Sequence, residues 1–291
     1  MDGILNVLKP PGMTSHDVVA YLRRLLKTKK VGHGGTLDPD AAGVLPVFIG
    51  TATRLLEFAV AGDKQYLVEM TLGCQTDTGD DSGAVIKQMP VPVLDSEKIS
   101  AVLQQFTGQI MQTPPMYSAL KVDGRKLYEL ARKGIEVERK ARPIHIYRLE
   151  LLHMTPDALT LAVDCSKGTY IRVLVEDIAE ALGTCATMSF LLRTKVGGFS
   201  AAFAHTLQEI AEAPESCLAD PLQAVSQLPR LMLTGRQAAR ITSGVRTTVA
   251  GTEDGRYALL GPAQEFLGIG SCCEEKIQVE KVFYHYPMQE E

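Results

Sequence analysis

The sequence predicts an α+β fold with one large and one small domain. Apolar residues alternate along two strand-like stretches, 66–72 and 159–165, while other stretches carry apolar residues at helical spacing. These strands and helices do not follow one another in the regular order of a doubly wound sheet, which favours α+β over α/β. The chain has 291 residues, 45% of them hydrophobic and 22% charged, which is typical of a globular protein of this organisation.

The elements of the large domain are predicted from capping residues, apolar spacing and glycine stops. In chain order we expect a helix beginning at Thr14 or Ser15, a strand at 66–72, a turn at 76–83, a helix from Asp95 or Ser96 to Gly108, a basic helical, hairpin-like segment after Pro115 that ends near Pro143, a strand at 159–165, and a helix at 171–182 before Gly183. The strands have the alternation of half-buried strands, and the helices each carry one apolar face.

The small domain is predicted after a proline-rich and polar stretch near 213–229. Beyond this stretch, a short helix from Thr234 to Ser243 leads into four short strand-like runs. We therefore predict a domain at 1–228 and a second, β-rich domain at 229–291.

Basic charge is concentrated in one segment, although the chain as a whole has a net charge of −4. Residues 121–148 carry nine Lys or Arg against four Asp or Glu, a local balance of +5. Such a segment suits contact with phosphates. A charge run by itself more often marks a solvated helix face, so both interpretations stay open.

The cysteines and acidic residues do not indicate a metal site. The six cysteines show no C-x-x-C spacing, which is typical of reduced thiols in a cytosolic protein. The acidic turn beginning at Asp77 resembles a calcium loop, but its sixth position is Ser82 instead of Gly and its twelfth is Gln88 instead of Glu. No segment has the length and apolarity of a membrane span. We therefore expect a cytoplasmic protein with neither a metal nor a membrane anchor.

One carboxylate stands out in Gly-His-Gly-Gly-Thr-Leu-Asp-Pro at 32–39, where Asp38 lies among glycines, a histidine and Pro39. Glycines permit tight turns and close approach to a ligand, and proline fixes the chain directly after the acid. Asp followed by Pro is also a good helix start, with Asp38 as the N-cap. The octapeptide alone therefore leaves a functional carboxylate and a helix cap both open.

Three further motifs accompany this stretch, and the set resembles a known family. They are Leu-Asn-Val-Leu-Lys-Pro-Pro-Gly at 5–12, Pro-Met-Tyr-Ser-Ala-Leu-Lys at 115–121 and Cys-Ser-Lys-Gly-Thr-Tyr-Ile-Arg at 165–172. In this order the four motifs closely resemble the TruB family of bacterial tRNA pseudouridine synthases. The resemblance implies a mixed-sheet pseudouridine synthase fold with a basic helical, RNA-clamping insertion at about 115–148. The C-terminal domain at 229–291 resembles a PUA-type RNA-binding module.

The resemblance also implies an activity. Members isomerise uridine to pseudouridine at position 55 in the T loop of tRNA, by cleaving the glycosidic bond and re-attaching the base through C5. The target base must first be flipped out of the stack. Because the net reaction is an isomerisation, we expect no cofactor. Relatives act alone on the T arm, so we expect a monomer that needs no guide RNA or protein partner.

The resemblance assigns roles to individual residues. Asp38 matches the catalytic aspartate, Arg172 the arginine that pairs with it, and Tyr66 the tyrosine that stacks on the flipped uracil. His33, Tyr170 and Leu191 match the other substrate-binding positions, and the expected RNA-binding residues are Lys9, Arg125, Lys126, Arg132 and Lys133. Lys9 belongs to the family's Lys-Pro motif, which we expect to support the site more than to take part in the chemistry.

Two positions depart from the family pattern, and two other functions remain alternatives. Gly34 stands where many relatives have Thr, and Leu192 stands where an Arg often precedes Arg193. A non-catalytic RNA-binding or tRNA-folding protein would not need the carboxylate of Asp38. A guide-dependent synthase would need further interaction surfaces, for which the compact C-terminal part offers little room.

Overall fold

The computed structural model describes residues 1–118, 120–122, 124–131 and 133–287. Its internal contacts divide the chain into two compact units, Met1–Gly62 with Lys195–Glu291 (unit 1) and Asp63–Thr194 (unit 2). This division differs from the predicted boundary at 228/229, because unit 1 joins both ends of the chain. Each unit is described by itself. Within the described parts of the chain, no helix combines the length and the apolarity that crossing a membrane requires.

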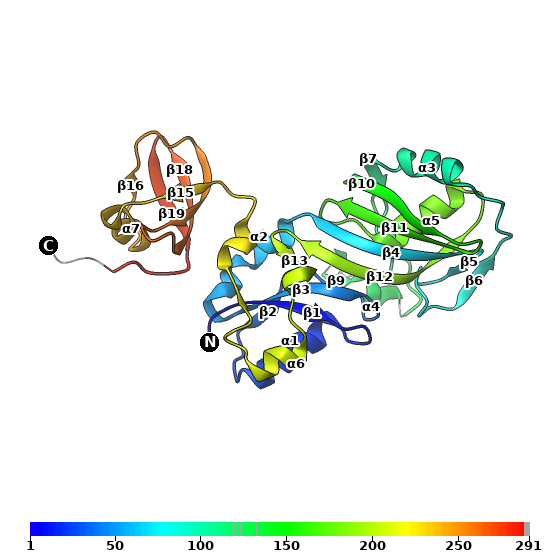
Figure 1. The fold of residues 1–291 in the computed structure, drawn as a ribbon, viewed down its shortest axis with the longest axis horizontal. Coiled ribbons are helices and arrows are strands. Elements are labelled where there is room, and N and C mark those ends of the chain that lie inside the picture. The colour runs from blue at the N-terminus through cyan, green and yellow to red at the C-terminus, as the bar shows by residue number, and fades with distance from the viewer. Residues whose placement is uncertain (119, 123, 132, 288–291) are drawn as a thin grey trace. The chain divides into compact units, whose positions relative to one another are not determined.

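In its described residues, unit 1 contains strands of two sheets and four α-helices (Figure 1). Its strands are β1 (Gly3–Lys9), β2 (Val31–His33), β3 (Ala42–Ile49), β13 (Phe199–Ser200), β14 (Leu218–Ala219), β15 (Arg230–Met232), β16 (Thr247–Thr248), β17 (Gly255–Leu260), β18 (Phe266–Cys273) and β19 (Lys276–Val282). Its helices are α1 (Ser15–Leu25), α2 (Leu56–Ala61), α6 (Leu207–Glu212) and α7 (Gly235–Thr242), with 3-10 helices at Gly50–Leu55, Ala201–Phe203 and Pro221–Val225.

The first sheet of unit 1 is organised around β1, which pairs antiparallel with β14 on one side and β3 on the other. β3 also pairs with β2. Both β1 and β3 are almost continuously apolar and are buried along nearly their whole length, as strands covered on both faces are. The predicted first helix is confirmed as α1. Thr14 caps it in a capping box with Asp17, and its apolar face packs on β1 and β3.

The C-terminal part of unit 1 forms its own five-stranded sheet, in the order β15-β17-β18-β19-β16. The pairing of β15 with β17 is parallel and the others are antiparallel, so the sheet is mixed. Helix α7 packs on it through a separate apolar cluster that includes Ile241, Leu259 and Ile277. A separate core is consistent with the predicted module at 229–291.

In its described residues, unit 2 contains five strands of the ten-stranded sheet, the two-stranded sheets β5–β6 and β8–β9, and two principal helices. Its strands are β4 (Lys64–Leu72), β5 (Cys74–Thr76), β6 (Val85–Gln88), β7 (Gly108–Gln112), β8 (Lys121–Val122), β9 (Arg125–Lys126), β10 (Arg142–Met154), β11 (Ala158–Cys165) and β12 (Ala186–Val196), which ends in unit 1; its helices are α3 (Ser96–Gln105), α4 (Leu127–Ala131) and α5 (Ile171–Ala181). The sheet order is β12-β4-β11-β10-β7. Helices α3 and α5 contact each other and pack on β10 and β4, respectively.

The strands and helices of unit 2 that were predicted from regularly spaced apolar residues are confirmed. The predicted strands at 66–72 and 159–165 lie in β4 and β11, which pair antiparallel with Val68 opposite Leu161. The helix expected after Asp95 is α3, with the Asp95 side chain accepting from the Lys98 N–H, and the helix expected at 171–182 is α5. The alternation along β4 is complete, because every second residue from Lys64 to Leu72 is buried.

The basic insertion is less helical than expected. It leaves the sheet after β7 and returns at β10, where Gln112 and Arg142 are paired. Between them lie the hairpin β8–β9 and the five-residue helix α4, and residues 142–148 belong to β10. The insertion is therefore 113–141. Arg132 lies outside the described residues.

Candidate active site

Asp38 lies in the loop between β2 and β3, and no helix begins there. The N–H of Ala41 donates to the carbonyl of Asp38 over 3.2 Å, which closes a turn, and the chain then enters β3. The alternative in which Asp38 caps a helix is therefore wrong. The side chain of Asp38 is half-buried.

The backbone is fixed on both sides of Asp38. On one side, the buried Ser15 hydroxyl accepts from the Leu37 N–H over 2.9 Å and donates to the Leu37 carbonyl over 3.1 Å. On the other side, the Pro39 carbonyl accepts from the Gly12 N–H at 3.0 Å and from the Lys9 ammonium at 2.8 Å. A side chain held between two anchored peptides has a restricted position, which is what a reacting carboxylate requires.

Lys9 occupies a different place from the RNA-contacting one we predicted. It is fully buried at the end of β1, and its ammonium donates to the carbonyls of Pro10 (2.9 Å), Met13 (2.5 Å) and Pro39 (2.8 Å). A buried cation satisfied by carbonyls holds backbone segments together and is not presented to a phosphate. The structure thus corrects the predicted RNA contact of Lys9, while its expected supporting role agrees with this geometry.

His33 ends β2, opposite Val47 on β3, and the loop that carries Asp38 starts directly after it. The next residue, Gly34, donates its N–H to the Pro46 carbonyl over 2.8 Å. A Cβ at Gly34 would lie 3.2 Å from the Phe48 ring and 3.3 Å from Ala59. The departure from Thr at this position therefore fits tight packing in this chain.

Tyr66 lies on the buried face of β4, and its side chain is 9% exposed. On the same face, two residues earlier, stands Lys64, which is also buried. Burial, together with the nearby charge of Arg193, lowers the pKa of Lys64 to about 8. The predicted site residues include neither Lys64 nor Arg193, which is fully buried in β12. The signal for Lys64 was present, because a lysine at an inward position of a strongly alternating strand is unusual.

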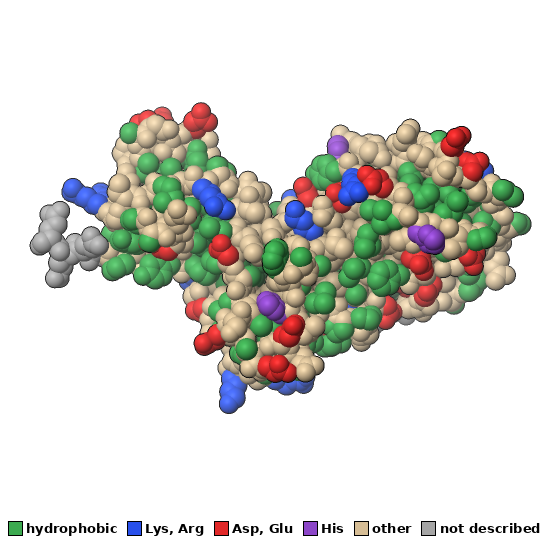
Figure 2. Space-filling model, viewed as in Figure 1, with side chains coloured by type: hydrophobic (Ala, Val, Ile, Leu, Met, Phe, Trp, Pro, Cys, Tyr) green, Lys and Arg blue, Asp and Glu red, His purple; other side chains and the backbone are tan. Residues whose placement is uncertain are grey.

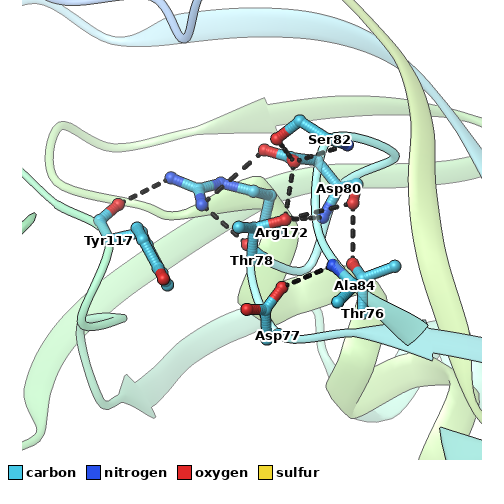
Figure 3. A network of polar contacts seen from close by, with 8 residues as sticks. All are labelled: Thr76, Asp77, Thr78, Asp80, Ser82, Ala84, Tyr117 and Arg172. Carbon is cyan, nitrogen blue, oxygen red and sulfur yellow. Dashed lines mark hydrogen bonds and ion pairs between the residues drawn. The ribbon is translucent and has the colours of Figure 1, made fainter. Parts of the chain in front are cut away.

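Arg172 lies in the first turn of α5 and is only 6% exposed. One guanidinium nitrogen donates to the Thr78 carbonyl over 2.7 Å, and the other donates to the Tyr117 carbonyl over 2.8 Å (Figure 3). The same group lies 3.8 Å from a carboxylate oxygen of Asp80. The guanidinium is thus oriented by backbone from two distant segments of unit 2.

The Asp80 carboxylate is itself held in place by its turn. One of its oxygens accepts from the Thr78 hydroxyl (2.7 Å), the Ser82 hydroxyl (2.5 Å) and the Ser82 N–H (3.1 Å), while the other oxygen faces Arg172 (Figure 3). The Thr76 hydroxyl donates to the Asp80 carbonyl over 2.7 Å. The acidic turn thus orients an arginine. The turn predicted at 76–83 is confirmed, with the Gly79 N–H donating to the Thr76 carbonyl and the Gly83 N–H to the Asp80 carbonyl, but its contact with Arg172 was not predicted. Within the described residues, no group of three or more His, Cys, Asp or Glu could hold a metal ion.

The remaining predicted substrate residues also lie in unit 2. Tyr170 immediately precedes α5 and is half-buried, and Leu191 is a buried residue of β12. The structure therefore places Asp38 and His33 in unit 1 and Tyr66, Tyr170, Arg172 and Leu191 in unit 2. The pairing of Asp38 with Arg172 stays a prediction.

Among the predicted RNA-binding residues of the insertion, Arg125 and Lys133 have exposed side chains. On the face of the molecule drawn in Figure 2, the Lys and Arg side chains are scattered among Asp and Glu and form no continuous area among the described residues.

Two family models match consecutive parts of the chain. The model for the TruB family pseudouridylate synthase N-terminal domain matches residues 23–171, and the model for the tRNA pseudouridylate synthase B C-terminal domain matches 172–232. Curated relatives match nearly the whole chain. The tRNA pseudouridine synthase B of Heliobacterium modesticaldum is 45% identical over 96% of this chain and 93% of its own length. That of Caldanaerobacter subterraneus is 46% identical over 97% and 99%.

Solved structures share the fold. A chain from a crystal structure of a Cbf5-Nop10-Gar1 complex superposes with a TM-score of 0.77 at 29% identity, covering 99% of this chain and 87% of that one. A chain from an archaeal box H/ACA Nop10-Cbf5 complex gives 0.74 at 28% identity, covering 99% and 88%. These neighbours agree with the predicted mixed-sheet fold and β-rich C-terminal module.

Proposed function

The chain belongs to the TruB family of pseudouridylate synthases, and from this we propose that it isomerises uridine to pseudouridine at position 55 in the T loop of tRNA. The family makes the protein an enzyme of this class. The substrate is supported by the names of its relatives, tRNA pseudouridine synthase B. The observation that carries the assignment is the placement of Asp38, in a loop whose peptides are anchored directly before and after the acid.

The reaction defines what the site has to supply. The C1′–N1 glycosidic bond breaks, and the detached uracil turns so that C5 bonds to C1′. C5 then loses its proton, and N1 gains one. The base has to leave its stack before any protein group reaches the sugar. We assign to Asp38 the carboxylate that acts on the target nucleotide, as a nucleophile or as a base. The atoms balance without an oxidant or a metal.

Unit 2 supplies the other proposed roles. Arg172 favours the ionised form of Asp38 by pairing with it, and its guanidinium is oriented for one task by the carbonyls of Thr78 and Tyr117. Tyr66 stacks on the flipped uracil. Tyr170 and Leu191 complete the pocket, and His33 holds the rearranged T loop.

The proposed RNA partner is the T arm of tRNA, bound by a monomer without a guide RNA or a partner protein. The exposed cations Arg125 and Lys133 of the insertion, with Lys126 and Arg132, contact phosphates. The module at 229–291 adds a second RNA contact. The complexes named for the Cbf5 structures belong to those proteins, whereas the relatives at 45% and 46% identity are named for tRNA.

The test is to incubate the purified protein with an unmodified tRNA transcript and to locate pseudouridine by mass-resolved mapping. We expect conversion at position 55 without additives, and none with Asp38→Asn, because an amide cannot act as a nucleophile or base. The matched control is Asp40→Asn, an exposed acid two residues away, which should retain turnover. Normal turnover by Asp38→Asn would falsify the catalytic assignment. Tight tRNA binding without any pseudouridine in the wild-type protein would favour a tRNA-folding function instead.

A further inference from the structure

Gln112, the last residue of β7, makes an unusual pair of contacts with Tyr170. Its side-chain oxygen accepts from the Tyr170 N–H over 2.8 Å, and its side-chain NH₂ donates to the Tyr170 carbonyl over 3.1 Å. The residues are 58 positions apart, and Gln112 is only 3% exposed. A single amide thus holds both polar groups of the Tyr170 main chain, and only one orientation of the amide satisfies both.

The contact lies where α5 begins. Tyr170 is the N-cap residue of α5, and no side-chain hydrogen bond caps the helix. Its carbonyl accepts the first helical bond from the Leu174 N–H over 3.1 Å, in addition to the bond from Gln112. Gln112 therefore anchors the first turn of the helix from outside, and this turn carries Arg172.

Gln112 also lies at the root of the insertion. It is paired with Arg142, and the insertion leaves the sheet at the next residue. Arg139 donates to the Pro114 carbonyl over 3.1 Å, which brings the far end of the insertion back to its start. Five residues after Gln112, the Tyr117 carbonyl accepts from Arg172. The root of the insertion is thus joined to the start of α5 twice, once through Gln112 and once through Arg172.

We infer that Gln112 is a positioning residue of the reaction, an inference that rests on the proposed function. It fixes Tyr170 and the first turn of α5 against the root of the RNA-binding insertion. The insertion, which binds tRNA, and Tyr170 and Arg172, which place the target base, are then held by the same contact between the root of the insertion and the start of α5. Loss of Gln112 therefore slows the chemical step, while the phosphate contacts of the insertion and the affinity for tRNA are retained.

The informative variant is Gln112→Met, which keeps the length of the side chain and removes both hydrogen bonds. Gln109→Met is the matched control, since Gln109 is an exposed residue of the same strand. In single-turnover assays on tRNA transcript we expect Gln112→Met to lower the rate constant at saturating enzyme at least tenfold, with the Kd for tRNA within twofold of wild type. The control should leave both constants unchanged.

Hydrogen exchange gives a readout that does not depend on activity. The Tyr170 amide donates to Gln112, so its exchange should accelerate at least tenfold in Gln112→Met, while the amides of β4 keep their protection. If Gln112→Met does not fold, Gln112→Asn replaces it. Asparagine keeps an amide but is one methylene shorter, so it cannot make both bonds to Tyr170, and the same loss of rate is expected with a smaller change in amide exchange.

The outcomes separate this inference from the proposed function. An active wild-type protein whose rate constant is unchanged by Gln112→Met would overturn the positioning role alone. A rate and an affinity that fall together, in parallel with the melting temperature, would show that Gln112 only supports the fold. A wild-type protein that makes no pseudouridine would refute the proposed function, and the role assigned here with it.

Discussion

Replacing Lys9 by Met tests whether the buried ammonium holds the loop that carries Asp38. The substitution keeps an unbranched side chain and removes three hydrogen bonds, to the carbonyls of Pro10, Met13 and Pro39. Hydrogen bonds to a charged group contribute about 1.5–3 kcal/mol each, so the gross loss is about 4–9 kcal/mol. The ammonium no longer has to be desolvated, which returns several kcal/mol. Pro10 and Pro39 are exposed, so water can reach their carbonyls. We therefore expect a net loss of about 2–4 kcal/mol in the free energy of unfolding.

The assay combines calorimetry with single-turnover kinetics. A loss of this size lowers the melting temperature by about 3–7 °C in a protein of this length. Because Pro39 follows Asp38, we also expect pseudouridine formation to slow by about tenfold to a hundredfold, the effect of a small displacement of a reacting group. Lys98→Met, at an exposed lysine of α3, is the control. An unchanged melting temperature with weaker tRNA binding and a shallower salt dependence would refute this reasoning and restore Lys9 as an RNA contact.

Three further substitutions test other parts of the site. One base–aromatic stack contributes about 1–3 kcal/mol, so Tyr66→Leu should lower the single-turnover rate constant or the tRNA affinity by the corresponding factor, whereas Tyr66→Phe should be close to wild type. Equal activities of Tyr66→Leu and the wild-type protein would exclude stacking. The double variant Arg125→Ala with Lys133→Ala should flatten the plot of log Kd against log salt by about one unit for each phosphate that is no longer bound, and an unchanged slope would remove these residues from the RNA interface. The pKa of Lys64 is about 8 in the folded protein and 10.5, its ordinary value, in the unfolded chain. Between these two pH values the unfolded chain therefore binds more protons than the folded protein. Urea unfolding from pH 7.5 to 10.5 should therefore show the wild-type free energy of unfolding rising relative to Lys64→Met, by at most about 3 kcal/mol; a falling difference would contradict the lowered pKa.

The sequence pattern alone predicted the helices and strands whose apolar residues recur regularly, at helical spacing over at least two turns or at every second residue of a strand. Helix α1 has its cap, its acidic N3 residue Asp17 and its apolar face within twelve residues, and strand β4 alternates without a break. Every interaction that defines these elements is close in sequence, so composition and spacing identify them.

The partners of the polar site residues could not be predicted in the same way. Arg172 finds the Thr78 carbonyl 94 residues away and the Tyr117 carbonyl 55 residues away. Every residue has a backbone carbonyl, so the sequence does not indicate which carbonyls accept hydrogen bonds from Arg172. The motif predicted that Arg172 belongs to the site, but the role of Asp80 in orienting it follows only from the folded turn.

The insertion is partly a hairpin and partly a short helix, where a basic helical, hairpin-like segment was predicted. Gly124 adopts a φ of +80° in the turn of the β8–β9 hairpin, and Gly134 adopts +67° after α4. These two glycines occupy the left-handed region that helices cannot continue through, so the segment forms a hairpin and a short helix.

The C-terminal module shares part of its apolar core with the first sheet, which composition alone did not predict. Besides its own core, it buries Leu260, Phe266 and Ile269 in a cluster with Ile4 and Phe48 of the first sheet. Deleting the module would expose this apolar surface to water, at a cost of roughly 25 cal/mol per Å². A truncated protein that lost activity would then report on the stability of β1 and of β3, the strand that follows the Asp38 loop, as much as on RNA binding. The contribution of the module to tRNA affinity therefore has to be measured with substitutions of its exposed side chains, which leave the shared cluster intact.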